Sequence, residues 1–136
     1  MKVEKKSAPK VNLSSNSKAK KYRTNLRNAL ANNEVNFAGK YIIAQWGCGT
    51  GCTESAIIDA KTGNVFFPNE LQGVLAGGMS LGNHEMIEYR NNSNLLLIYG
   101  YAGSNFTEGK ESQHGIYYYQ WNGKELKLLK FIKKKE

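Results

Sequence analysis

The chain has 136 residues, of which 40% are hydrophobic, and its formal net charge is +8. This length is typical of one domain with a buried core. No apolar run approaches the roughly 18 residues of a membrane-spanning helix, so we expect no membrane span. The positive charge lies at the two ends: residues 1–27 carry a net +8 and residues 124–136 a net +4, whereas residues 28–123 carry a net −4. Terminal clusters made almost entirely of lysine predict solvated tails rather than a nucleic-acid interface.

The first 16 residues are rich in Lys, Ser and Asn and nearly free of large apolar side chains. Such a segment buries too little surface to offset its ordering entropy, so we predict a disordered basic leader over 1–16. A single β-rich domain is expected over 17–136. Residues 1–7 lack the apolar segment of a signal peptide, which favours a mature form without its leader or a cytoplasmic protein.

Apolar residues recur every three or four positions over 18–32, which predicts one amphipathic helix. Its apolar positions are Ala19, Tyr22, Leu26, Ala29 and Leu30. The Ser17 hydroxyl can cap its first turn, and Asn32 and Asn33 can end it, because asparagine tolerates the left-handed conformation.

From residue 40 onward the apolar period changes to two, which predicts strands. We expect strands at 40–46, 55–60, 65–67, 85–89, 95–101, 115–121 and 126–132. The continuous apolar run at 95–101 predicts a central strand buried on both faces. The glycine-rich segment 69–83 and the polar segment 102–113 are expected to be loops, and Asn122-Gly123 predicts a two-residue type I′ hairpin turn.

These elements together predict a mainly β, α+β fold. We expect an antiparallel meander sheet or small open barrel of six to seven strands, with one N-terminal helix over one face or edge.

The most distinctive feature is a glycine-rich loop between the first two strands. It holds the chain's only two cysteines, Cys48 and Cys52, around Gly49, Thr50 and Gly51. Two cysteines four positions apart can bridge a tight turn, so we predict a disulfide. A disulfide favours an oxidising compartment and would fix the shape of Gly49–Gly51 for contact.

Two other interpretations of these cysteines remain open. Cys48 and Cys52 with His84 and His114 form the inventory of a structural zinc site, but the histidines lie much farther apart than the three to five residues of finger-type sites. A reactive thiol would need a helix N-terminus or a fixed histidine, which the sequence does not place beside either cysteine. We therefore expect no metal and no cofactor.

The aromatic strand 115–121 must point its side chains to both faces in turn. One set belongs to the core. The other set, drawn from Tyr118 and Trp121 with Tyr99 or Tyr101 on a neighbouring strand, would form either an exposed patch typical of interfaces or a surface packed against the helix.

Several motifs in sequence order resemble an uncharacterised family of small exported bacterial proteins. They are YRTNL at 22–26, NFAGKY at 36–41, WGCGTGC at 46–52, AIID at 56–59, KTGNV at 61–65 and YYQWNGKEL at 118–126. The resemblance implies export to the periplasm or cell surface and brings no catalytic residues.

These observations predict a non-catalytic periplasmic binding protein, in its specific form an immunity or inhibitor protein for a toxin or envelope enzyme. We expect a protein partner, no nucleic acid, and a monomer or weak dimer. The expected binding residues are Trp46, Gly49, Thr50, Gly51, Tyr99, Tyr101, Tyr118 and Trp121. The alternatives are a metal- or thiol-dependent protein and a structural envelope protein held to an anionic polymer by its lysine ends.

Overall fold

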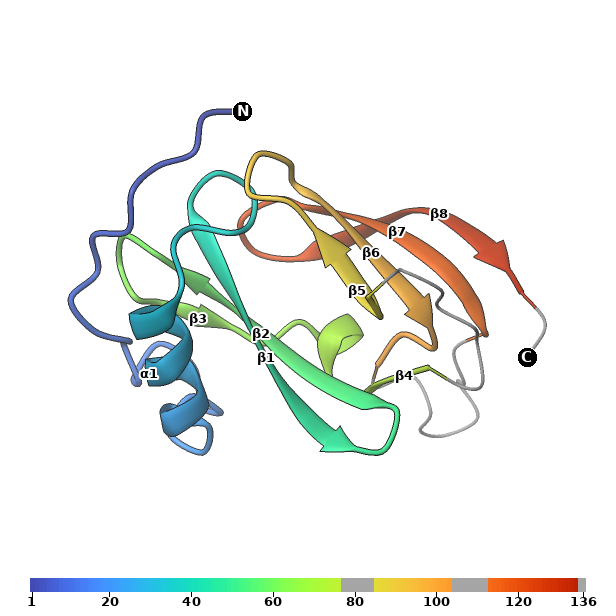
Figure 1. Cartoon of the computed structure of the whole chain (residues 1–136), viewed down its shortest axis with the longest axis horizontal. Coiled ribbons are helices and arrows are strands. Elements are labelled where there is room, and N and C mark those ends of the chain that lie inside the picture. Colours follow the sequence, from blue (N-terminus) through green and yellow to red (C-terminus); the bar gives the residue numbers. More distant parts are fainter. Residues whose placement is uncertain (77–84, 104–112, 135–136) are drawn as a thin grey trace.

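A computed structural model describes residues 1–76, 85–103 and 113–134 of the chain. These residues form a helix, α1 (Arg23–Asn32), a short 3-10 turn, η1 (Asn69–Leu71), and two antiparallel sheets that do not close into a barrel (Figure 1). The predicted mainly β, α+β class with an N-terminal helix is confirmed.

The two sheets divide the chain near its middle. The first sheet contains β1 (Tyr41–Gly49), β2 (Cys52–Asp59) and β3 (Val65–Phe66) in that order, and β4 (Val74–Leu75) pairs with β2 near the hairpin tip. The second contains β5 (Ile87–Tyr89), β6 (Leu95–Gly100), β7 (Gly115–Trp121) and β8 (Leu126–Lys133) in sequence order. The predicted meander is therefore confirmed for the second sheet. The prediction that all strands form one continuous sheet was wrong, because they form two.

The layers are ordered helix, first sheet, second sheet, with a hydrophobic cluster in each gap (Figure 1). Ile43 and Ile57 face the cluster between the sheets, together with Leu96 and Ile98 of β6. Ile42 and Ile58 face the cluster under α1, together with Leu26 and Leu30. The strands buried on both faces are thus β1 and β2.

The prediction that 95–101 is buried on both faces was wrong. Leu96 and Ile98 are fully buried, but the alternate residue Leu95 is 37% exposed and Leu97 is half-buried. In the described part of the chain α1 packs on β1 and β2, on the far side of the first sheet, and not on that side of β6. An apolar run shows that a strand is apolar on both sides, but it does not show that both sides are covered.

Residues 1–16 belong to the fold, contrary to the expected disordered leader. The backbone N–H groups of Ser7 and Ala8 donate to the Ala60 carbonyl oxygen at 2.9 and 2.8 Å, and that of Asn12 donates to Gly63 at 2.9 Å. Ala8 and Val11 are buried in the cluster under α1. A few apolar residues suffice here because backbone hydrogen bonds to the β2–β3 turn add to their burial.

We expect Val11→Asp to lower the free energy of unfolding by about 2 kcal/mol, because it places a carboxylate in an apolar site. Val11 is 5% exposed, whereas Val3 of the same segment is 39% exposed, so Val3→Asp is the matched control. Urea denaturation of both variants provides the measurement. Equal, near-zero effects would show that the segment does not pack on the domain.

The helix begins later than predicted. Residues 17–22 form turns, α1 starts at Arg23, and its N-cap residue Tyr22 makes no side-chain cap, so the predicted Ser17 cap was wrong. The helix ends at Asn32 as predicted, but Asn33 is extended, with φ −124°, rather than left-handed. Asn33 instead donates its side-chain Nδ2 to the Ala29 carbonyl oxygen at 2.9 Å.

The β7–β8 hairpin also differs from the prediction. Trp121 pairs with Leu126, so four residues connect the two strands. The prediction of a two-residue type I′ turn was therefore wrong. Asn122 Oδ1 accepts the backbone N–H groups of Lys124 and Glu125, both at 2.9 Å, and this side-chain turn replaces the backbone turn.

Candidate functional site

The predicted disulfide between Cys48 and Cys52 is confirmed. Their Cα atoms lie 5.1 Å apart at the tip of the β1–β2 hairpin, where residues 47–51 are exposed. The start of the segment after β4 supports the tip, since the Ala76 N–H donates to the Gly51 carbonyl oxygen at 3.0 Å. The disulfide is compatible with an oxidising, extracellular compartment.

We expect the double substitution Cys48→Ser, Cys52→Ser to lower the free energy of unfolding by about 2 kcal/mol, the entropic value of closing so short a ring. Reduction of the native protein is expected to give the same loss. Guanidinium denaturation with and without dithiothreitol checks both, and the double variant itself should not respond to reductant. If the free energy of unfolding falls in the variant but not in the reduced native protein, the loss comes from the serine side chains and not from the missing disulfide.

The alternative of a metal or thiol site is not supported by the placement of its residues. Disulfide-bonded Cys48 and Cys52 have no thiolate to offer. His114 is 6% exposed, with Nε2 3.1 Å from the Ala76 carbonyl oxygen and Nδ1 3.4 Å from that of Lys134. Within the ranges that the structure describes, no group of three His, Cys, Asp or Glu could hold a metal ion, and His84 lies outside those ranges.

The predicted aromatic residues do not form one patch. Trp46 packs its ring on Tyr22 at a centroid distance of 4.9 Å, on the helix side of the first sheet. Tyr101 packs on His114 at 4.9 Å. Trp121 is 3% exposed and belongs to the core, so its assignment to a binding surface was wrong.

Tyr99 and Tyr118 lie on the side of the second sheet that faces away from the first sheet. Cross-strand pairing of Leu97 with Tyr118 and of Tyr99 with Ile116 puts all four on this side, and Ile116 pairs with Ile132 of β8. We name the outer face the surface formed by Leu95, Leu97, Tyr99, Ile116, Tyr118 and Ile132. Apart from Leu95, which is exposed, its members are half-buried. The alternative prediction, that these tyrosines pack against the helix, was wrong. The first sheet lies between α1 and the second sheet.

Charges are asymmetric along the outer face. Lys130 lies opposite Tyr118, with its Nζ 5.8 Å from the ring centroid, and Lys127 lies opposite Gln120. On the β5 side, Glu88 hydrogen-bonds to Tyr99. Partial burial, followed by the charge of Glu88, raises the pKa of the Tyr99 hydroxyl, which therefore stays protonated near neutral pH. The β8 side is thus the cationic side.

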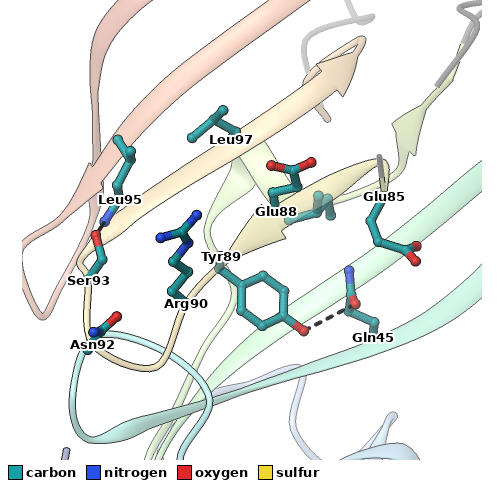
Figure 2. A pocket seen from close by; sticks show the side chains of 10 residues that line it. Gln45, Glu85, Glu88, Tyr89, Arg90, Asn92, Ser93, Leu95 and Leu97 are labelled. Atoms are coloured by element: carbon teal, nitrogen blue, oxygen red, sulfur yellow. Dashed lines mark hydrogen bonds between the residues drawn. The ribbon is translucent and has the colours of Figure 1, made fainter. Parts of the chain in front are cut away.

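A pocket of about 880 Å³ adjoins the outer face at the β5 end (Figure 2). Leu95 and Leu97 line one part of it and Gln45 of β1 lines another. The Tyr89 hydroxyl donates to Gln45 Oε1 at 3.3 Å and so links β5 to β1. Neither residue stands out in the sequence, because each lies in an ordinary strand pattern and only the packing of the two sheets brings them together.

Glu54 on β2 is a half-buried carboxylate with an incompletely satisfied side chain. One oxygen, Oε2, is buried and has no described hydrogen-bond partner, while the carboxylate accepts a backbone N–H from Gly73. Burial raises the pKa of Glu54 above 4.5, and Lys18 and Lys21 oppose that shift only in part.

We expect Glu54→Gln to stabilise the protein at pH 7. An acid with a raised folded-state pKa binds more protons in the folded than in the unfolded state. Its stabilising contribution to the free energy of unfolding is therefore fully present below pH 4.5 and is lost as the pH rises through the folded-state pKa. The gain from Glu54→Gln should therefore shrink as the pH falls toward 4.5. Thermal unfolding from pH 4 to 8 measures it, with the exposed Glu125→Gln as control; a gain independent of pH would contradict this assignment.

No family model, curated protein or solved structure matches this chain. The family resemblance noted in the sequence therefore stays a prediction. Within the described residues, no helix has the length and apolar character needed to cross a bilayer.

Proposed function

We propose that the protein is a non-catalytic binding protein of the cell envelope whose protein partner docks on the outer face of the second sheet. The observation that supports this proposal is a sheet face with six apolar or aromatic side chains and no helix or strand packed on it in the described part of the chain. Aromatic residues with neighbouring apolar side chains are typical of the buried centre of protein interfaces.

The charges beside this face favour an acidic partner. Lys127 and Lys130 of β8 lie beside the outer face, and β8 ends at Lys133, which Lys134 follows. Lysines at the rim of an interface accelerate association with an acidic surface and make binding sensitive to salt. An immunity or inhibitor protein that covers an acidic site on a toxin or envelope enzyme is the specific form of this proposal.

Affinity capture from envelope extract, with the partner identified by mass spectrometry, tests the proposal. Tyr118→Glu should weaken capture by at least about tenfold, because it removes an aromatic contact and repels an acidic partner. The half-buried Tyr118 lies beside Lys130, which can pair with the new carboxylate and preserve the fold.

Thr50→Glu at the disulfide-closed tip is the matched control, because Thr50 is exposed and lies in the β1–β2 turn of the first sheet. It should retain the partner. If Thr50→Glu abolishes capture while Tyr118→Glu does not, the hairpin tip rather than the outer face is the interface. Binding that does not weaken between low and high salt would contradict the proposed role of the lysines.

A further inference from the structure

A second surface, distinct from the outer face, lies between α1 and the free edge of β1. It is a groove of about 400 Å³, named here the amide groove, and its principal lining residues are Asn25, Asn28, Asn32, Gln45, Trp46 and Tyr89. All the described residues that line it are uncharged, although 22% of the chain is charged. A ligand of this groove is therefore selected by hydrogen bonds and shape rather than by charge.

The asparagines form a stripe on the helix. Positions 25, 28 and 32 are three and four residues apart, so their side chains lie on one face of α1, beside β1. No described protein group hydrogen-bonds to these three side chains. Asparagine is a weak helix former, and three of the ten residues of α1 are in this stripe. The helix thus gives up intrinsic stability to hold three unpartnered amides, each with two N–H donors and a carbonyl acceptor.

The opposite side of the groove is held in place by packing. The Tyr89 hydroxyl donates to Gln45 Oε1 at 3.3 Å, so the Gln45 amino group is left to donate hydrogen bonds to a ligand. The Tyr89 ring packs edge-on against Phe37 at 6.1 Å, and Trp46 is supported by Tyr22 at 4.9 Å. Two anchored aromatic rings and one oriented amide therefore face the asparagine stripe.

The β1 edge in this groove is closed to an added peptide strand. Asn36 occupies both backbone groups of Ile43: its Oδ1 accepts the Ile43 N–H at 2.8 Å, and its Nδ2 donates to the Ile43 carbonyl oxygen at 3.4 Å. A peptide that extends a sheet needs those groups free. The groove consequently favours a ligand that binds through side-chain amides.

We propose that the amide groove binds a neutral oligosaccharide. Each sugar hydroxyl both donates and accepts hydrogen bonds, which matches the paired donors and acceptor of an amide, and the apolar C–H face of a sugar ring packs on an aromatic ring. The groove offers both kinds of group: the side-chain amides of the α1 stripe and of Gln45 on β1, and two aromatic rings, Trp46 on β1 and Tyr89 on β5. This site goes beyond the proposed protein-binding function, and either can fail without the other.

The test is a titration of the ¹⁵N-labelled protein followed by NMR. The probes are chitotetraose and maltotetraose, which are neutral, and tetragalacturonate, which is anionic. At least one neutral probe should shift the side-chain NH₂ signals of Asn25, Asn28 and Asn32 and the indole N–H signal of Trp46 saturably, with a Kd of about 1 mM. Tetragalacturonate should leave these signals unmoved.

The variant Asn25→Ala, Asn28→Ala, Asn32→Ala should weaken the binding by more than about tenfold and raise the melting temperature, because alanine is the stronger helix former. Thr24→Ala, on the same helix but outside the groove, should bind normally. Gln45→Glu, at an exposed position, provides a second variant that should also weaken binding. The proposal is overturned if neither neutral probe shifts these signals, if the triple and Gln45→Glu variants bind like the native protein, or if tetragalacturonate shifts the same signals equally.

Discussion

Replacing Gly103 by alanine is expected to lower the free energy of unfolding by about 4 kcal/mol, a large fraction of the stability of a typical domain. Gly103 follows β6 and is buried, and a Cβ atom there would overlap the backbone carbonyl group of Gln72. The Gly103 N–H also donates to the Glu70 carbonyl oxygen at 2.9 Å, which fixes the approach of the two segments. The clash is with backbone on both sides, so no flexible side chain can move to relieve it.

The Gln72 segment cannot retreat cheaply. Gln72 is buried, and its Nε2 donates to the carbonyl oxygens of Ser55 at 3.3 Å and of Pro68 at 3.2 Å. These bonds hold the η1 segment against β2. Moving it away from Gly103 would therefore break contacts of the first sheet as well as the second.

Gly47→Ala is the matched control for this prediction. Gly47 lies in the exposed part of β1, has no left-handed φ, and an added Cβ would meet no atom within 4 Å. Urea denaturation should give a change within about 0.5 kcal/mol for Gly47→Ala. Similar stabilities for the two variants would mean that the close approach of Gly103 and Gln72 is not a feature of the folded protein.

Local patterns predicted most strands, but not how the strands are grouped. Runs of strand-forming residues located β1, β2, β6, β7 and β8 within a few residues. They could not locate β4, because two residues carry no period and β4 is defined by its long-range pairing with β2 and with Tyr101. The ordering of residues 1–16 was missed for the same reason, since it depends on hydrogen bonds to Ala60 and Gly63, far along the chain.

The candidate sites were predictable only in part. The spacing of Cys48 and Cys52 predicted the disulfide, because a short ring is a local property. The prediction grouped Tyr118 and Trp121 in one patch, although residues three apart in a strand point to opposite faces. Which of the two is covered depends on Tyr41 and Phe66, whose rings pack on Trp121. The asparagine stripe was visible in the sequence at helical spacing, but on a polar helix face it has no distinguishing signal until β1 is placed beside it.

The location of the doubly buried strand gives the last prediction. We expect Ile57→Ala and Ile58→Ala each to lower the free energy of unfolding by about 4 kcal/mol, although the two residues are adjacent. Both are fully buried in β2, Ile57 toward the second sheet and Ile58 toward α1. In a strand with one exposed face, one of two adjacent substitutions would be mild.

Leu95→Ala provides the contrast, because Leu95 begins the apolar run that looked like the central strand. It is 37% exposed, so its loss should cost less than about 1 kcal/mol. Chemical denaturation of the three variants decides between the two assignments of the buried strand. Large losses of stability for both β2 variants and a small loss for Leu95→Ala require a first sheet covered on both faces and a second sheet with one uncovered face. This arrangement leaves the outer face free for a partner. A large loss for Leu95→Ala would instead show that this face is covered in the folded protein, and the proposed interface would then be a core.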